Sequence, residues 1–246
     1  MCLKPDEQLD DLQVGGLTII QKKNGFRFGM DAVLLSDFAK SHPAKCTLDL
    51  CTGTGIVPLL LSAKTTIPTL CGLELQQDIA DMASRCVSLN HLSDRIHIQC
   101  GDLRRAESFY GVRCFDSITC NPPYIPVGSG LRNPSDTKTI SRHELFCTLE
   151  DVISTSARLL TQTGRLFLVH RPNRLVDVLA LMRSYRIEPK RVRFVHPTVQ
   201  KEPSLVLVEG LLYGKAELRI APPLFVYGED GNYSDELNQI YERTSS

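Results

Sequence analysis

Apolar and polar positions follow an order along the chain that is typical of α/β proteins. Short apolar runs predict strands at 46–51, 69–75, 96–100, 115–120 and 165–170. Between them, apolar residues recur every three or four positions at 56–64, 77–91, 149–160 and 174–185, which predicts amphipathic helices. The segment before residue 46 has a helix-like pattern. Alternation of strands and helices requires right-handed crossovers and a mainly parallel sheet.

Two further strands are predicted close to the end of the chain, at 191–195 and at 205–213, with no helix between them. Successive strands without a crossover pair antiparallel, so we expect an antiparallel strand at the edge of the sheet. The sequence thus predicts a Rossmann-like, doubly wound, mainly parallel sheet of seven strands. We expect one domain over residues 1–246, with an N-terminal cap segment at 1–45 and the sheet within 46–246.

The composition is typical of a globular protein, and its balanced charge does not indicate a particular binding partner. Of the 246 residues 42% are hydrophobic, and the 28 basic residues balance the 28 acidic ones. No apolar run is long enough for a membrane span, and the first residues lack the layout of a signal peptide. The nine cysteines include no C-x-x-C pair, so we expect free thiols, a cytoplasmic protein and no metal site.

A glycine loop follows the first strand of the sheet. The sequence Asp49-Leu50-Cys51-Thr52-Gly53-Thr54-Gly55 lies where the strand gives way to a helix, and its glycines allow a tight turn and close approach of a ligand. Glu74 lies near the end of the next strand, where its carboxylate can bind a ribose diol. Asp102 follows the third strand, where it can accept a hydrogen bond from an adenine amine.

The glycine loop favours S-adenosylmethionine over a nicotinamide cofactor. Dehydrogenases prefer G-x-G-x-x-G, whereas Gly53-Thr54-Gly55-Ile56-Val57-Pro58 lacks the third glycine. Asp49 is not needed to bind a pyrophosphate, but it suits a ligand with a cationic amino acid end. A dehydrogenase is therefore the weaker alternative.

Asn121-Pro122-Pro123-Tyr124 follows the fourth strand directly. Two prolines end the strand and make a rigid turn at the sheet edge where ligands bind. The Asn121 side-chain oxygen and the Pro122 carbonyl can accept hydrogen bonds from a planar amino group, which localises the lone pair on its nitrogen. Rigid acceptors are needed for this effect, and Tyr124 offers a face for base stacking. This pattern predicts methylation of an amino or amide nitrogen.

Together these motifs resemble class I methyltransferases of the N-P-P-[YF] branch. The segment Gly25-Phe26-Arg27-Phe28-Gly29-Met30-Asp31, the pair His143-Glu144 and the closing Tyr233-Ser234-Asp235-Glu236-Leu237 resemble the bacterial tRNA1(Val) adenine-37 N6-methyltransferase family. The resemblance implies that Phe28, Gly29 and Asp31 line the cofactor pocket; a packing role is the alternative. The predicted cofactor site comprises Phe28, Gly29, Asp31, Asp49, Cys51, Gly53, Gly55, Glu74, Leu75, Asp102, Leu103 and Asn121.

The resemblance implies an adenine in tRNA, at position 37 of the anticodon loop, as the substrate. Other targets of the same chemistry are an adenine in ribosomal RNA or DNA and the glutamine side chain of a protein. A module that binds S-adenosylmethionine without catalysis is a further alternative, which the intact motif at 121–124 opposes. Candidate RNA contacts are the polar loop at 125–143 and a basic cluster of Arg183, Arg186, Lys190, Arg191 and Arg193. The alternative for the cluster is a solvated surface without an RNA-binding role.

Overall fold

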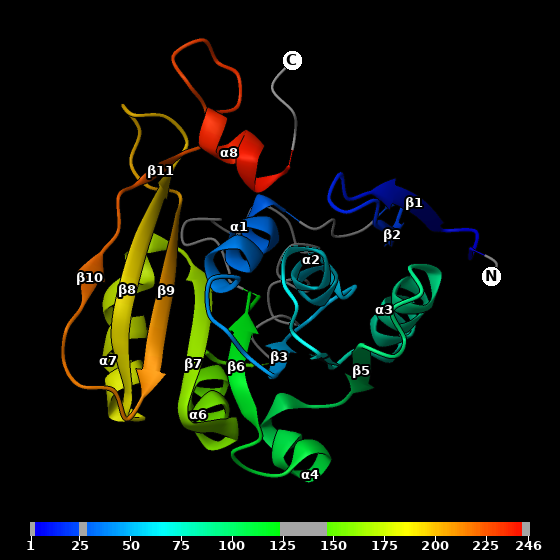
Figure 1. Cartoon of the computed structure of the whole chain (residues 1–246), viewed down its shortest axis with the longest axis horizontal. Coiled ribbons are helices and arrows are strands. Elements are labelled where there is room, and N and C mark those ends of the chain that lie inside the picture. The colour runs from blue at the N-terminus through cyan, green and yellow to red at the C-terminus, as the bar shows by residue number, and fades with distance from the viewer. Residues whose placement is uncertain (1–2, 25–28, 124–146, 243–246) are drawn as a thin grey trace, which may run out of the picture.

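The computed structural model describes residues 3–24, 29–123 and 147–242. Its centre is a sheet of nine strands in the order β10-β8-β9-β7-β6-β3-β4-β5, with β11 also paired to β8 (Figure 1). The strands are β3 (Cys46–Leu50), β4 (Thr69–Glu74), β5 (Ile96–Cys100), β6 (Phe115–Cys120), β7 (Leu160–His170), β8 (Ile187–His196), β9 (Leu205–Leu212), β10 (Arg219–Ile220) and β11 (Leu224–Phe225). Seven long strands form the predicted sheet, and β10 and β11 add two residues each.

Helices alternate with these strands as the periodicity predicts. They are α1 (Met30–Ala39), α2 (Ile56–Lys64), α3 (Gln77–Leu89), α4 (Ala106–Tyr110), α6 (Leu149–Leu159), α7 (Leu175–Ser184) and α8 (Asp235–Ile240), with 3-10 turns η1 (Leu103–Arg105) and η2 (Pro172–Arg174). Helix α6 begins at a reciprocal cap: Thr148 Oγ1 accepts from the Asp151 N–H, and the Asp151 carboxylate accepts from the Thr148 N–H.

The antiparallel strand is not at the edge of the sheet, where we expected it. Strand β9 lies between β7 and β8 and is antiparallel to both. After β7, the crossover through α7 leads to β8, which lies two strand positions away from β7 in the sheet. Strand β9 then occupies the position between them. Order along the chain fixes the antiparallel pairing, but not which of the two last strands lies outside.

The N-terminal segment also differs from its helix-like pattern. Residues Glu7–Asp11 (β1) and Thr18–Lys22 (β2) form an antiparallel hairpin, which packs on α3. The turn contains Gly15 and Gly16, both at positive φ. A Gly-Gly pair of this kind favours a hairpin turn, although the first strand, Glu7–Asp11, contains one apolar residue and has no clear strand pattern of its own. The first helix is α1, from residue 30.

Each face of the sheet is covered by its own hydrophobic core. On one face, α1, α2 and α3 pack with side chains such as Phe167, Val169 and Leu207. On the other face, α6 and α7 pack with side chains such as Leu166, Leu168 and Val208. Figure 1 shows these two helix layers with the sheet between them. Both faces are therefore buried, and the strand ends remain as the places where polar groups can gather.

Candidate active site

The carboxyl ends of four parallel strands bring the predicted motifs to one edge of the sheet. Leu50 of β3 is paired with Leu73 of β4 and with Cys120 of β6, and Glu74 is paired with Cys100 of β5. The glycine loop, Glu74, Asp102 and Asn121 each lie at or just after these residues. Carboxyl ends of parallel strands are where open α/β sheets bind ligands.

The glycine loop has the backbone geometry that its residues suggest. Gly53 has φ +57°, and Gly55 has φ +80° at the start of α2. Cys51 shares the left-handed conformation, with φ +57°, although it carries a side chain. A Cβ placed on Gly53 would meet no atom of residues 3–24, 29–123 and 147–242 within 4 Å. Within the part of the chain that the structure describes, the loop thus has open space at Gly53.

Glu74 is held beneath this loop. Its carboxylate is buried and accepts hydrogen bonds from the Gly53 N–H and the Gln76 N–H, both at 3.0 Å. The Thr52 N–H also donates to the Leu73 carbonyl at 3.0 Å, which ties the loop to β4. Each carboxylate oxygen has a second acceptor position. Glu74 can therefore hold the loop and still accept from a ligand hydroxyl.

Asp49 is buried inside the same edge. Its Oδ1 accepts a hydrogen bond from Thr119 Oγ1 of β6 at 2.7 Å. Burial raises the pKa of Asp49 to about 7, and the nearby Glu74 charge acts in the same direction, while the Thr119 hydrogen bond opposes the shift. A carboxyl group poised near neutrality can ionise when a cation arrives. Sequence reasoning did not single out Thr119, although its spacing from Ser117 places both on one face of β6.

Asp102 begins η1 and is ion-paired with Arg104. The Arg104 guanidinium binds both carboxylate oxygens, at 2.5 Å from Nη2 and 3.0 Å from Nε, and holds the pKa of Asp102 below its usual range. The Gly101 N–H donates to the Glu74 carbonyl at 2.8 Å, so this turn is fixed to β4. An adenine amine would share the Asp102 carboxylate with Arg104, a partner that the sequence did not indicate.

Asn121, Pro122 and Pro123 follow β6 at its carboxyl end, where Asn121 is half-buried, Pro122 is buried and Pro123 is exposed. Cys120, which precedes them, is fully buried on the strand, as a structural thiol should be. Tyr124, Phe28, the loop at 125–143 and the pair His143-Glu144 lie outside the described residues.

The remaining predicted cofactor residues are placed around the same elements. Gly29 immediately precedes α1, and Asp31 lies in the first turn of that helix, which packs against α2 and β7. Leu103 is buried in η1, and Leu75 is half-buried after β4. Among residues 3–24, 29–123 and 147–242, no group of three or more His, Cys, Asp or Glu side chains is arranged to hold a metal ion. No described helix is long and apolar enough to cross a membrane.

The predicted basic cluster does not gather into one surface. Because β9 is antiparallel to both neighbours, β8 runs parallel to β7 and β6. Arg183 and Arg186 precede β8 and so lie at the sheet edge opposite Asn121. Arg193 is ion-paired with Glu236 at 2.6 Å, and Lys190 Nζ donates to the Lys215 carbonyl at 3.2 Å. An RNA-binding role for these residues stays a prediction.

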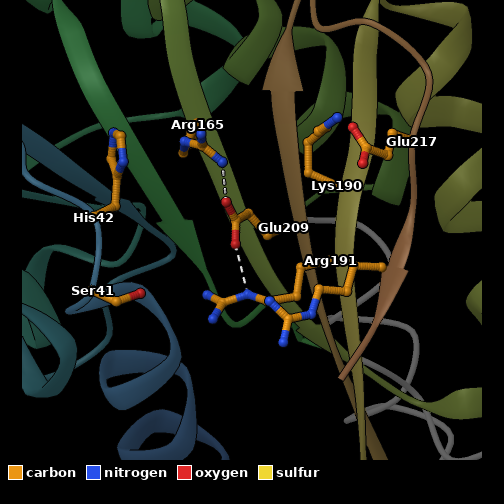
Figure 2. Close-up of a pocket in the computed structure, with 8 residues that line it drawn as sticks. Ser41, His42, Arg165, Lys190, Arg191, Glu209 and Glu217 are labelled. Carbon is orange, nitrogen blue, oxygen red and sulfur yellow. Dashed lines mark hydrogen bonds and ion pairs between the residues drawn. The ribbon is translucent and has the colours of Figure 1, made fainter. Parts of the chain in front are cut away.

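Arg191 has a structural role that its place in the cluster did not suggest. Its guanidinium lies 3.9 Å from the centroid of the Phe38 ring and donates to the Phe38 carbonyl at 2.8 Å. Glu209 of β9 bridges Arg191, at 2.7 Å, and Arg165. Figure 2 shows this bridge in a pocket of about 400 Å³ lined by Ser41, His42, Arg165, Lys190, Arg191, Glu209, Glu217 and Arg219. The pocket lies on β7, β8 and β9, away from the glycine loop.

Solved structures share this fold. A predicted O-methyltransferase from Agrobacterium tumefaciens, protein Atu636, superposes with a TM-score of 0.71 over 87% of this chain and 96% of its own, at 22% identity. TYW2 from Pyrococcus horikoshii, in complex with MeSAdo, superposes with a TM-score of 0.59 over 86% of this chain and 73% of its own, at 12% identity. These similarities confirm the class I methyltransferase fold.

Similarity in sequence identifies the family, whereas similarity in structure shows the fold alone. No protein-family model matches the chain. A protein of Porphyromonas gingivalis named tRNA1(Val) (adenine(37)-N6)-methyltransferase is 33% identical over 224 residues, which cover 88% of this chain and 87% of the relative. A protein of the same name from Tolumonas auensis is 29% identical over 241 residues, or 93% and 95% of the two chains. This chain therefore belongs to the tRNA1(Val) (adenine(37)-N6)-methyltransferase family.

Proposed function

We propose that this protein transfers a methyl group from S-adenosylmethionine to the N6 amino group of an adenine in tRNA, at position 37 of the anticodon loop. The observation that carries the proposal is the meeting of the glycine loop, Glu74 and Asn121-Pro122 at one edge of the sheet, in a member of a family whose relatives are named for this reaction. An anticodon-loop base is already unpaired, so a small enzyme can take it out of its stack at low cost.

The described residues fit S-adenosylmethionine. The open space at Gly53 admits a ligand close to the backbone, and the buried Glu74 carboxylate beneath it suits a ribose diol. Asp49 supplies a carboxyl group whose negative charge would favour the cationic amino acid end. Asp102 is placed one strand further on, where it would face the adenine amine with Arg104. When bound, S-adenosylmethionine supplies an electrophilic methyl group.

The protein's part in the reaction is to orient and polarise the target nitrogen. The Asn121 side-chain oxygen and the Pro122 carbonyl would accept hydrogen bonds from the adenine amino group and localise its lone pair. Their rigidity comes from β6, whose end is fixed between β3 and β7. Acceptors fixed before the reaction contribute most when charge develops. No side chain has to remove a proton first, because the proton leaves after the nitrogen becomes cationic.

The test is transfer of labelled methyl groups to total tRNA from a strain that lacks this modification, followed by separation of the nucleosides and mass spectrometry. We expect label in N6-methyladenosine. Asn121→Ala should lower the rate by roughly 100- to 1000-fold, as loss of one fixed polar group does elsewhere. Calorimetry with S-adenosylmethionine reports on folding and on the cofactor site of the variant. Absence of label in tRNA, with cofactor binding intact, would overturn the tRNA assignment in favour of ribosomal RNA, DNA or a protein amide.

We also propose that residues 1–246 act as one cytoplasmic domain in which 1–45 form a cap. Support comes from the shared core: Leu12, Val14, Ile19 and Ile20 of the N-terminal segment belong to the same cluster of buried side chains as α1 and α2.

A further inference from the structure

Three cysteines meet at the candidate active site, and neither the predicted cofactor chemistry nor the methyl-transfer step uses their thiols. Cys51 lies in the glycine loop, Cys120 directly precedes Asn121, and Cys147 directly precedes the cap of α6. The Cys51 and Cys147 sulfurs are 3.8 Å apart. Residues 51 and 147 are 96 positions apart in the chain, so the fold, not local sequence, produces this contact.

The three cysteines differ in solvent exposure, which indicates which two of them can form a disulfide on oxidation. Cys120 is fully buried, whereas Cys51 and Cys147 are each half-buried. A small oxidant therefore reaches this pair, and Cys147 in particular, more readily than the strand cysteine. The sulfurs need to approach by less than 2 Å to reach a disulfide bond length of about 2.05 Å.

We propose that Cys51 and Cys147 form a dithiol modification site that a hydroperoxide closes to a disulfide, and that this bond switches the cofactor loop off. The inference rests on the proposed function, since its consequence assumes that the loop binds S-adenosylmethionine.

Oxidation of the two thiols to a disulfide consumes one molecule of hydroperoxide. The sulfur of Cys147 attacks the peroxide O–O bond and becomes a sulfenic acid, releasing water from hydrogen peroxide or an alcohol from an organic peroxide. The Cys51 sulfur then attacks the sulfenic sulfur, and water leaves as the S–S bond forms. Two thiols are oxidised and one peroxide is reduced. A small thiol reverses the step by thiol–disulfide exchange.

The environment keeps both thiols protonated at rest. Contact with Cys120 raises the pKa of Cys51, and contact with Cys51 together with burial raises the pKa of Cys147. Since the thiolate is the reactive form, oxidation should be slow at neutral pH and faster in alkaline solution. The site would thus respond to sustained peroxide and not to traces of it.

The disulfide would act through the position of the loop. Cys51 already has a left-handed backbone, and its neighbour Thr52 is tied to β4 through the Leu73 carbonyl. Pulling Cys51 toward α6 therefore moves the segment between Asp49 and Gly53. A displacement of about 1 Å at such a loop can lower a reaction rate roughly 100-fold.

The experiment treats the full chain with hydrogen peroxide, maps cross-linked peptides by mass spectrometry without reduction, and measures S-adenosylmethionine binding by calorimetry and methyl transfer to tRNA. We expect a Cys51–Cys147 cross-link, a transfer rate lowered roughly 100-fold, weaker cofactor binding, and recovery of both with dithiothreitol. Cys147→Ser and Cys147→Ala should keep the activity of the reduced protein and resist peroxide. Cys114→Ser is the matched control, because this half-buried thiol lies at the amino end of β6.

A Cys51–Cys120 cross-link, no cross-link, or a cross-link that leaves cofactor binding unchanged would each overturn the proposal. Peptide mapping does not depend on activity. A reduced protein that fails to bind S-adenosylmethionine would therefore contradict the proposed function alone, while the cross-link would still report on the thiol pair.

Discussion

Glu74 accepts a hydrogen bond from the Gly53 backbone N–H at 3.0 Å, so the acid at the end of β4 and the glycine loop after β3 form one structural unit. Its other oxygen accepts from the Gln76 N–H. We expect Glu74→Gln to place an amide NH₂ against one of these two donors. The variant should lose about 1–3 kcal/mol of unfolding free energy and bind S-adenosylmethionine more weakly, as denaturant titration and calorimetry would measure. Glu107→Gln, on α4, is the control: it weakens only an exposed ion pair with Arg158, so it should cost at most about 1 kcal/mol and leave cofactor binding unchanged.

Gly53 tests whether a ligand lies against the loop. Alanine there should cost about 1–2 kcal/mol for its left-handed backbone, while the described residues leave space for its methyl group. A bound cofactor would contact the new methyl group, so calorimetry should show S-adenosylmethionine affinity lowered tenfold or more, roughly 1.4 kcal/mol. Gly16→Ala is the matched control, because Gly16 has φ +66° and no atom of the described residues lies within 4 Å of its Cβ, and it should leave cofactor binding unchanged. Equal affinity in both variants would mean that no ligand approaches Gly53.

The ionisation of Asp49 should make both stability and cofactor binding depend on pH. Burial raises its pKa from 3.8 to about 7 in the folded protein. The folded state therefore holds the proton more tightly, and this group's contribution to the unfolding free energy falls as the pH rises from about 4 to 7. Binding of a cationic ligand favours the ionised form, so S-adenosylmethionine affinity should rise over the same window, by at most about tenfold per pH unit.

Calorimetry between pH 5.5 and 7.5 measures this effect on binding. Asp49→Asn should bind S-adenosylmethionine weakly and almost independently of pH over this range. Asp116→Asn, at the amino end of β6, should retain the pH profile of the parent protein. A parent affinity that does not change with pH would contradict a cationic ligand group beside Asp49.

Glu209 should be needed for stability, since it lies between the guanidinium groups of Arg165 and Arg191. Glu209→Ala leaves two part-buried cations without their carboxylate, which should cost roughly 3 kcal/mol of unfolding free energy. Glu188→Ala removes the partner of Arg183, whose side chain is 66% exposed, and should cost at most about 1 kcal/mol. Urea titration of both variants gives the comparison; similar losses would show that the bridge is not structural.

The same ion pairs change what the basic cluster can be expected to do. Charge reversal at Arg191 should unfold or weaken the protein through Glu209 and Phe38, whatever its effect on RNA. Arg183→Glu and Arg186→Glu leave the core intact and are the better test. If these residues contact RNA, a gel-shift assay should show weaker tRNA binding with unchanged binding of S-adenosylmethionine. Unchanged tRNA binding would exclude both residues, which lie at the edge opposite Asn121, from the RNA contact.

Local patterns predicted the fold well where the residues of a single helix or strand are sufficient to specify it. The strand at 115–120 and the helix at 56–64 were predicted at their observed bounds. The helix predicted at 77–91 begins where α3 begins and ends two residues later than α3 does. Contacts between distant segments could not be predicted in this way. The insertion of β9 between β7 and β8, the Asp49–Thr119 hydrogen bond and the Cys51–Cys147 contact all depend on how separate elements are placed in space. The helix-like pattern of the N-terminal segment was wrong at 7–22, where Gly15 and Gly16 make the turn of a β-hairpin.

The position of β9 has a consequence for how this chain reaches its native state. A ribosome releases β7 and β8 before β9, yet in the folded sheet β9 lies between them and joins them. Until residue 212 has emerged, one backbone edge of β7 has no partner, and unpaired edges invite aggregation. The contact between β7 and the β8–β9 pair thus waits for a strand that is made after both β7 and β8, and pairing between segments distant in the chain is slow to form. A stalled or shortened chain that ends before Leu205 would expose that edge permanently.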